Sequence, residues 1–274
     1  MIRFLFGFLL FAAVAVTLTF LTLPIIAIFT HVPPGELIDQ LSNPVVHDAL
    51  IVSLKTSLVA QALILLFGTP TAYVLATRRF RGRSLLVTLV ELPIVLPPAV
   101  AGIGLLVAFG RTQGLLGERF GGWLAFTWMA VVAAIILVAG PFYVRQAIAA
   151  FETVDADLVA ASRTLGAGPV QTFFRVTLPL ARGGLIAGEA VALARGLGEF
   201  GATIMFAGSL KGTTQTLPLA VYAEFAAIDG FNTALAISAL LVIISLAILL
   251  SLKLSGLWQR ARPAVGAVVE TEGR

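Results

Sequence analysis

The sequence predicts an all-α integral membrane protein with six transmembrane helices. Its 274 residues are 59% hydrophobic and only 12% charged, whereas a soluble domain averages about 25% charged residues. Six apolar runs recur along the chain, and each reaches the roughly 20 residues that a helix needs to cross a bilayer. Because lipid offers the backbone no hydrogen-bond partners and the runs lack the alternation of barrel strands, we expect helices. A soluble globular enzyme is excluded.

The apolar runs set the limits of one transmembrane domain, residues 1–260. The first run is longer than the roughly 7–15 apolar residues of a secretory signal, so we interpret it as a span. Residues 261–274 carry glycine, proline and acidic residues without apolar periodicity, which predicts a disordered tail. The six spans are expected at about residues 4–29, 49–77, 85–109, 123–144, 184–206 and 231–254.

Positive charge lies mostly on one side of the predicted bundle. The net charge is +4, and most of the 18 lysines and arginines fall after span two, in the long 145–183 loop, or near the two ends of the chain. Because lysine and arginine accumulate in cytoplasmic loops, both termini and the 145–183 loop should be cytoplasmic. The charge thus serves membrane topology, and we expect no nucleic-acid partner.

Several kinds of chemistry are missing from the sequence. The chain has no cysteine and two histidines, His31 and His47, which lie too far apart for a metal-ligand set and which we expect in a solvated loop. A G-x-x-x-x-G-K-[ST] phosphate loop is also absent from the sequence. We therefore predict no catalytic residues, no metal and no cofactor on this chain.

A proline cluster interrupts the third predicted span. Pro93, Pro97 and Pro98 occur in the segment ELPIVLPPAVAGIG. A proline inside a membrane helix frees a carbonyl group that must find another partner, so this span should be kinked or locally unwound. The kink serves either helix packing or the lining of a pathway.

The 145–183 loop contains the pattern of a short amphipathic helix. Asp155 and Asp157 favour a helix N-terminus, and Gly166 favours its end. A helix this short is marginal in water, so either a partner protein or the membrane surface should stabilise it. The apolar positions at helical spacing are Val154, Leu158, Ala161 and Leu165.

The same loop resembles the EAA loop of ATP-binding-cassette importer permeases. That motif reads E-A-A, three residues, G, nine residues, I, one residue, L-P, and the spacing from Gly166 to Leu178-Pro179 is kept here. Ala160, Ser162 and Val176 depart from the motif residues Glu, Ala and Ile. The resemblance implies a type I, MetI-like bundle whose cytoplasmic coupling helix, about residues 155–168, docks on a separate ATPase subunit that binds ATP. It assigns the docking to Leu158, Ala161, Ser162, Leu165 and Gly166.

A second stretch, Ala194 to Tyr222, is similar to molybdate and tungstate permease subunits, which carry A-R-x-L-G-E-F-G-A-T and then G-x-T-x-T-L-P. Sulfate and thiosulfate permeases share a related G-E-F-G-A run and are the alternative. The resemblance implies a homodimeric inner-membrane permease that imports a tetrahedral oxyanion, most simply molybdate. Its implied partners are cytoplasmic ABC ATPase subunits, a periplasmic oxyanion-binding protein and membrane lipid.

The residues of this stretch suggest two roles. Arg195 and Glu199 are four residues apart on one helix face and form either a structural ion pair, which we favour, or part of a pathway mouth. Backbone amides and hydroxyls suit an oxyanion better than fixed counter-charges. The pathway or gate candidates are Gly201, Thr203, Gly208 and Ser209.

Two functions of other classes compete with a permease. A membrane anchor of a redox or hydrolytic enzyme would need a histidine pair for haem or a catalytic set within the bundle. A proton- or sodium-coupled carrier predicts an inverted repeat, which the sequence does not show.

Overall fold

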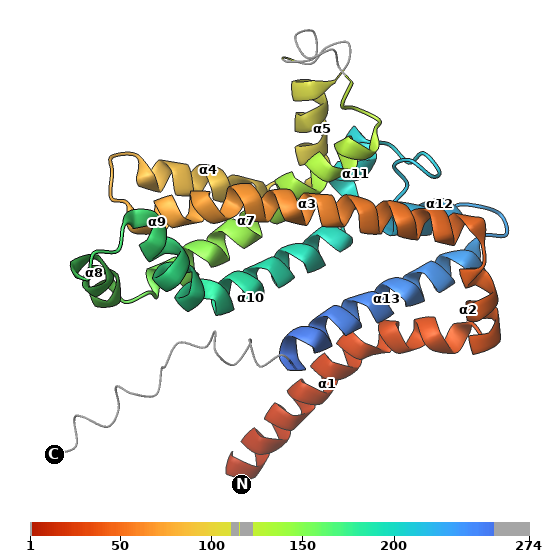
Figure 1. The fold of residues 1–274 in the computed structure, drawn as a ribbon. Helices are drawn as coiled ribbons and strands as arrows, with labels where there is room; N and C mark the ends of the chain where they lie inside the picture. Colours follow the sequence, from red (N-terminus) through yellow and green to blue (C-terminus); the bar gives the residue numbers. More distant parts are fainter. Residues whose placement is uncertain (1, 111–114, 116–122, 255–274) are drawn as a thin grey trace.

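The structure is a computed structural model that describes residues 2–110, 115 and 123–254, and all regular elements within these ranges are helices (Figure 1). The predicted tail 261–274, like Arg111 and Arg119, lies outside the described residues. The bounds of the elements, in chain order, are α1 Ile2–His31, α2 Pro34–Leu41, α3 Pro44–Thr77, α4 Arg83–Val95, α5 Pro98–Phe109, α7 Trp128–Glu152, α8 Ala156–Thr164, α9 Pro169–Thr172, the π-helical turn η1 Phe173–Thr177, α10 Leu178–Leu197, α11 Gly201–Phe206, α12 Leu217–Phe225 and α13 Phe231–Leu254.

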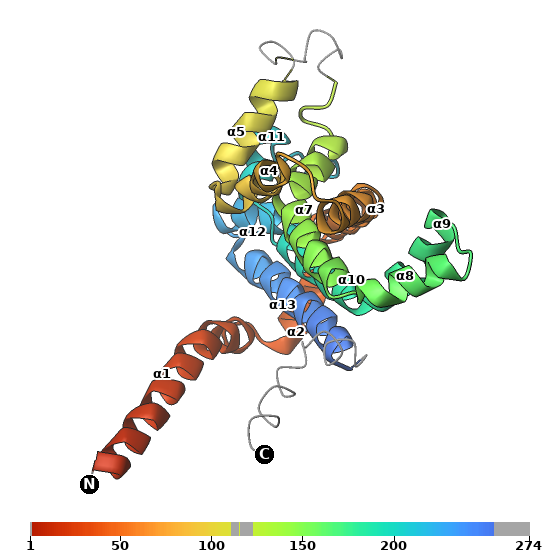
Figure 2. The same ribbon diagram turned by 90° about the vertical axis from the view of Figure 1, so that its left-hand side faces the viewer.

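The predicted all-helical membrane bundle is confirmed, with five segments of the described chain able to span a membrane and a bent pair as the candidate sixth. Five helical segments of the described chain are long and apolar enough to cross a membrane: α1, α3, α7, the continuous run from α9 to α10, and α13. The pair α4 and α5 passes the same test when taken together, but its two halves are bent by 114°, as in a broken span or a re-entrant loop. Helix α1 meets α13 at its end, where the ring centroids of His31 and Phe231 are 5.7 Å apart, and leaves most of its apolar surface exposed (Figure 2).

Helices α3, α7 and α10 form the core of the bundle. On α10, small residues recur every four positions at Gly184, Gly188, Ala192 and Gly196, so they share one face of the helix. This face packs on α7, where a Cβ added at Gly184 would lie 2.5 Å from the Cβ of Ala150. Because hydrophobic burial does not drive helices together in lipid, such close backbone contact is a main source of their association.

The third predicted span, 85–109, is two helices rather than one straight helix. Helix α4 ends at Val95, and α5 begins at Pro98 after two residues in extended conformation, Leu96 and Pro97. Neither Pro97 nor Pro98 can donate a backbone hydrogen bond, and a residue before proline is pushed out of the α-helical region. The proline cluster therefore breaks the span outright.

The fifth predicted span, 184–206, is shifted along the chain. Continuous helix runs from Pro169 to Leu197, and a break at Gly198–Phe200 separates it from α11. Arg175 and Arg182 ended the apolar run in the sequence, but they do not end the helix. The π-turn Phe173–Thr177 ends two residues before Pro179, so this proline, which has no backbone N–H, follows a local change in the hydrogen-bond pattern of the helix.

The fourth span also differs from its predicted limits, 123–144, because α7 begins at Trp128 and continues past Arg145 to Glu152. Arg145 lies 3.6 Å from Glu91 of α4, so its charge has a partner about two turns before α7 ends at Glu152. Helices α8 and α9 stand at this end, whereas α12 and the α11–α12 connection stand at the other (Figure 1). The arginine-rich loops are thus on the side of α8.

Candidate coupling and translocation sites

Helix α8 is the candidate coupling helix, and the caps predicted from the sequence fix its ends. The carboxylate of Asp155 accepts a hydrogen bond from the backbone N–H of Asp157 at 2.8 Å, which satisfies one of the free donors at the helix start. Gly166 follows the last turn with φ of +86°, a left-handed conformation that glycine adopts without strain. The loop therefore presents one short, sharply limited helix.

The predicted docking residues lie on the outer face of α8. Leu165 is 88% exposed and Leu158 is 49% exposed, and Ala161 and Gly166 are exposed with them. Ser162 differs, because its hydroxyl lies 3.1 Å from the hydroxyl of Thr172 in α9 and anchors the helix to the bundle. We define Leu158, Ala161 and Leu165 as the outer face of α8.

The opposite face of α8 closes a wide, half-open cavity of about 1480 Å³, which we call the basic cavity. From α8 it receives Ala156, Val159, Ala160 and Arg163, whose spacing of i, i+3, i+4 and i+7 defines one face of a helix. Its other walls are the last turns of α3 and α7, together with α9 and the π-turn. The remaining lining residues are Tyr73, Ala76, Thr77, Arg78, Arg79, Arg83, Phe151, Glu152, Val154, Ala167, Pro169, Val170, Phe173, Phe174 and Thr177.

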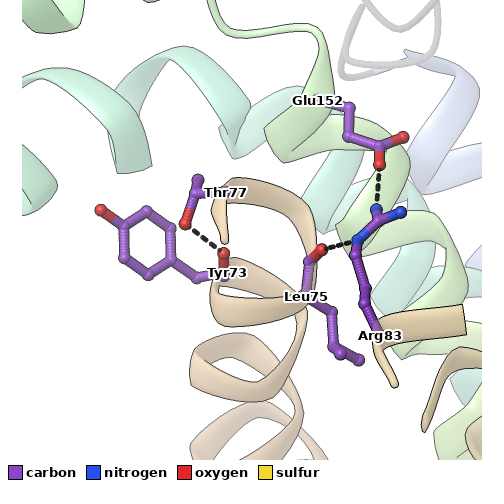
Figure 3. A network of polar contacts seen from close by, with 5 residues as sticks. All are labelled: Tyr73, Leu75, Thr77, Arg83 and Glu152. Carbon is purple, nitrogen blue, oxygen red and sulfur yellow. Dashed lines mark hydrogen bonds and ion pairs between the residues drawn. The ribbon is translucent and has the colours of Figure 1, made fainter. Parts of the chain in front are cut away.

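Arg83 fastens one wall of the basic cavity. Its Nη2 donates to Glu152 Oε1 at 2.6 Å, and its Nε donates to the carbonyl oxygen of Leu75 at 2.5 Å (Figure 3). The side chain thus joins the end of α3 to the end of α7. Arg83 and Glu152 neutralise each other, so this pair adds no net charge to the cavity.

The interior candidate site begins where α10 gives way to α11. Glu199 stands in the break, and its Oε1 accepts a hydrogen bond from the backbone N–H of Ala202 at 2.7 Å. Its Oε2 lies 2.9 Å from Nη1 of Arg195, an ion pair without hydrogen-bond geometry. The favoured structural pair is therefore present, and it ties the last turn of α10 to the first turn of α11.

Several buried polar atoms of the described residues lack a hydrogen-bond partner, and those of Gln61, Glu199 and Thr203 lie near this break. Within the described chain, buried side-chain atoms lack a hydrogen bond on Gln61, Thr203 and Thr216, in addition to Glu199 Oε2 and Glu189 Oε2. Gln61 of α3 lies beside Gly196, where an added Cβ would be 3.4 Å from its Nε2. Buried polar groups are normally hydrogen-bonded, so the side chains of Gln61 and Thr203, which unlike Glu199 form no ion pair in the described chain, are free to bond to water or a polar solute.

The four pathway candidates occupy different environments. Thr203 is fully buried in α11 and offers a free hydroxyl, and Gly201 packs on Pro98 of α5. Gly208 and Ser209 belong instead to the turn after α11, where the carbonyl of Gly208 accepts from Thr214 and the hydroxyl of Ser209 accepts from Gln215. Thr203 thus has a buried hydroxyl without a partner, whereas Gly208 and Ser209 have the bonding of a folded turn, and the pathway role of all four residues stays a prediction.

The structure brings Thr203, Glu199 and Arg195 to one region and keeps the docking residues of α8 at the far end of the bundle (Figure 1). Gln61 was missed in the sequence, although it is the lone amide side chain of the apolar run 49–77. That isolation is the signal that could have revealed it, because a polar residue in a span marks a site or a packing contact.

A membrane-embedded helical bundle with a broken span, free polar groups inside and an exposed helix at its arginine-rich end has the architecture of a transport subunit. The chain belongs to the family of binding-protein-dependent transport system inner membrane components, whose family model matches residues 64–261. The chain is thus a member of a family of inner membrane proteins, and its several apolar helices fit a protein that crosses the membrane more than once.

The similar proteins include transport permeases from several organisms. The chain is 41% identical over 236 residues to the molybdenum transport system permease protein ModB of Mycobacterium tuberculosis, covering 85% of this chain and 88% of that protein. It is 45% identical over 179 residues to ModB of Escherichia coli, covering 64% and 78%. It is 35% identical over 247 residues to the molybdate/tungstate transport system permease protein WtpB of Pyrococcus abyssi, covering 89% and 93%.

Solved structures share the fold. One chain of a bacterial ABC transporter involved in the import of alginate has a TM-score of 0.67 at 17% identity, covering 92% of this chain and 94% of that one. A chain of the inward-facing methionine ABC transporter MetNI has a TM-score of 0.61 at 20% identity, covering 80% and 97%. These likenesses confirm the predicted MetI-like importer fold.

Proposed function

We propose that this chain is the transmembrane permease subunit of an ATP-driven importer for a tetrahedral oxyanion, molybdate or tungstate. The observation that carries the proposal is the 41% identity over 85% of the chain to a molybdenum transport permease. The 35% identity over 89% of the chain to a molybdate/tungstate permease supports the same substrate class. Sulfate, the alternative, rests only on the shorter G-E-F-G-A run.

The interior chemistry suits the passage of an anion. Thr203 and Gln61 offer free hydroxyl and amide donors in a buried region, and the carboxylate of Glu199 is held by Arg195 and by a backbone N–H. A neutralised carboxylate does not repel an oxyanion as a free one would. Neutral donors bind weakly, which allows the ion to leave as easily as it enters.

The energy for transport comes from a partner in this proposal. The sequence has no phosphate loop, so the chain itself does not hydrolyse ATP, binds no cofactor of its own, and relies on a cytoplasmic ATPase subunit that docks on the outer face of α8. An exposed apolar strip on a short helix is the kind of surface that a protein groove receives. An extracytoplasmic binding protein delivers the oxyanion.

The assembly follows from the distribution of charge and exposed surface. The arginine-rich end with α8 faces the cytoplasm, and both termini are on that side. Two copies of the chain pair around the pathway, and α1, whose surface is left exposed in the single chain, contributes to the contact.

Uptake by a reconstituted complex tests the substrate. The chain is placed in liposomes with its ATPase and binding-protein subunits, and entry of labelled molybdate is measured in competition with tungstate and with sulfate. We expect ATP-dependent uptake that tungstate suppresses and that an equal concentration of sulfate leaves nearly unchanged. Equal competition by all three oxyanions would contradict the substrate assignment, and uptake of sulfate alone would favour the alternative.

A further inference from the structure

We infer that the basic cavity behind α8 is a binding site for one anionic phospholipid, whose headgroup phosphate is held by Arg78, Arg79 and Arg163. The inference concerns a second ligand and does not depend on which oxyanion the chain transports.

The first observation is an uncompensated positive charge. Of the four arginines that line the cavity, Arg83 is paired with Glu152, the sole carboxylate in the lining. Arg78, Arg79 and Arg163 have no ion-pair partner among the residues that the structure describes. Like charges brought together around one space repel, and a bound phosphate relieves that repulsion through charge-assisted hydrogen bonds.

The second observation is that the cavity is too large and too apolar for a free oxyanion. Its volume of about 1480 Å³ exceeds the roughly 300–1000 Å³ of sites that hold drug-sized molecules. Tyr73, Phe151 and Phe173 form an aromatic cluster in its wall, with ring centroids 4.8 to 6.3 Å apart. Phe174 and Val170 add exposed apolar surface. An amphiphile with a charged head and an acyl chain matches both kinds of wall.

The third observation is the position of the cavity along the bundle. Its walls come from the last turns of α3, which ends at Thr77, and of α7, which ends at Glu152. A span meets the headgroup layer at its ends, where arginine and aromatic side chains concentrate. Basic pockets between spans on the cytoplasmic side are a recurrent form of headgroup site. Lipid is therefore favoured over an acidic protein segment.

The two faces of α8 give the lipid a mechanical role. Arg163 and Val159 point into the cavity, whereas Leu158 and Leu165 lie on the outer face of the same helix. A lipid in the cavity can thus brace α8 from behind while the outer face stays free for a partner. Occupancy of the cavity would stiffen the helix without competing for its docking surface.

Native mass spectrometry of the full chain tests the inference, with dioleoylphosphatidylglycerol and dioleoylphosphatidylcholine as probes. We expect one phosphatidylglycerol to bind at least tenfold more tightly than phosphatidylcholine. The triple variant Arg78→Gln, Arg79→Gln, Arg163→Gln should bind it roughly hundredfold more weakly, at about fivefold for each arginine. If the triple variant fails to fold, the single variant Arg163→Gln provides the same test, and it should bind phosphatidylglycerol about fivefold more weakly.

A matched control removes the same charge outside the cavity. Arg81, Arg175 and Arg182 are exposed and do not line the cavity, so their triple replacement by glutamine should leave lipid affinity nearly unchanged. An equal loss in the two triple variants would overturn the inference, because surface charge would then explain binding. Displacement of the lipid by millimolar inorganic phosphate, which indicates a free-anion site, or by the ATPase subunit, would overturn it as well.

Discussion

Gly102 and Gly201 allow α5 and α11 to touch along their backbones. A Cβ added at Gly102 would lie 2.6 Å from the carbonyl oxygen of Ala202 and 2.8 Å from its Cα. Contacts this short force the backbone to move, since the obstacle is not the end of a flexible side chain. Helices α5 and α11 can therefore pack this closely only because these positions have no side chain.

The variant Gly102→Val should separate these two helices. We expect a loss of about 2 kcal/mol from overpacking and a fall in melting temperature of about 5 °C in detergent. Gly104→Val is the matched control in the same helix, because no atom lies within 4 Å of a Cβ built there. Equal melting temperatures for the two variants would show that α5 and α11 do not pack as described.

A second prediction concerns the contribution of the Arg195–Glu199 ion pair to stability. The side chain of Glu199 is 1% exposed, so Arg195→Met leaves a buried carboxylate with only the N–H of Ala202 as its partner. Breaking a buried pair costs about 3 kcal/mol or more. Adding Glu199→Gln removes the charge and keeps an oxygen acceptor, and the double variant should recover at least half of the lost stability.

The measurement is a double-mutant cycle on thermal unfolding of the purified chain. If the stabilities lost in the two single variants simply add in the double variant, the two side chains do not interact and the structural role is wrong. The spacing of Arg195 and Glu199 alone places them on one helix face. It does not predict that Glu199 caps α11, because that contact depends on a helix break that the spacing does not reveal.

Mutation of the outer face of helix α8 tests directly whether the ATPase subunit docks there. The double variant Leu158→Ser, Leu165→Ser should lower the affinity of the ATPase subunit at least tenfold, because about 1.5–3 kcal/mol is lost for each large apolar side chain that an interface buries. The fold should be unchanged, since both side chains are exposed in the single chain. Co-purification of the two subunits at graded salt concentrations measures the change.

Leu180→Ser is the control for this pair of substitutions and should leave ATPase affinity nearly unchanged. Leu180 is 52% exposed at the start of α10, and it belongs neither to the outer face of α8 nor to the lining of the basic cavity. Retention of the ATPase by the double variant at wild-type levels would show that the partner docks elsewhere.

The sequence predicted α8 well because local signals define that helix. Asp155 caps its start, and Gly166 adopts the left-handed conformation that ends it. The break of the third span followed in the same way from Pro97 and Pro98. What these residues could not predict is the angle of 114° between α4 and α5, which depends on the packing of α5 against α11.

The fifth span shows where counting apolar residues misleads. Arg175 and Arg182 ended the run in the sequence, but both are exposed at the end of the bundle, and the helix continues through them. The break at Gly198–Phe200 was also missed, since apolar residues continue on both sides of it. Hydropathy reports which segments prefer lipid, whereas helix limits depend on backbone partners and caps.

If α8 docks on a cytoplasmic ATPase, α8 and the α11–α12 connection, which stand at opposite ends of the bundle, must lie on opposite sides of the membrane. The chain contains no cysteine, so single cysteines can be introduced cleanly at Arg163 and at Lys211, both exposed. A membrane-impermeant maleimide should label Lys211→Cys in intact cells and Arg163→Cys only after the membrane is opened. Labelling of Arg163→Cys from outside would reverse the proposed orientation.

Transport itself shows whether ATP hydrolysis by a partner subunit drives an oxyanion through this chain by way of α8. Uptake of labelled molybdate is measured in liposomes that hold the chain, its ATPase and its binding protein. We predict uptake with ATP, none without it, and at least a tenfold reduction when Leu158 and Leu165 are replaced by serine. Sustained uptake by the chain alone, without ATP or the ATPase, would contradict the account.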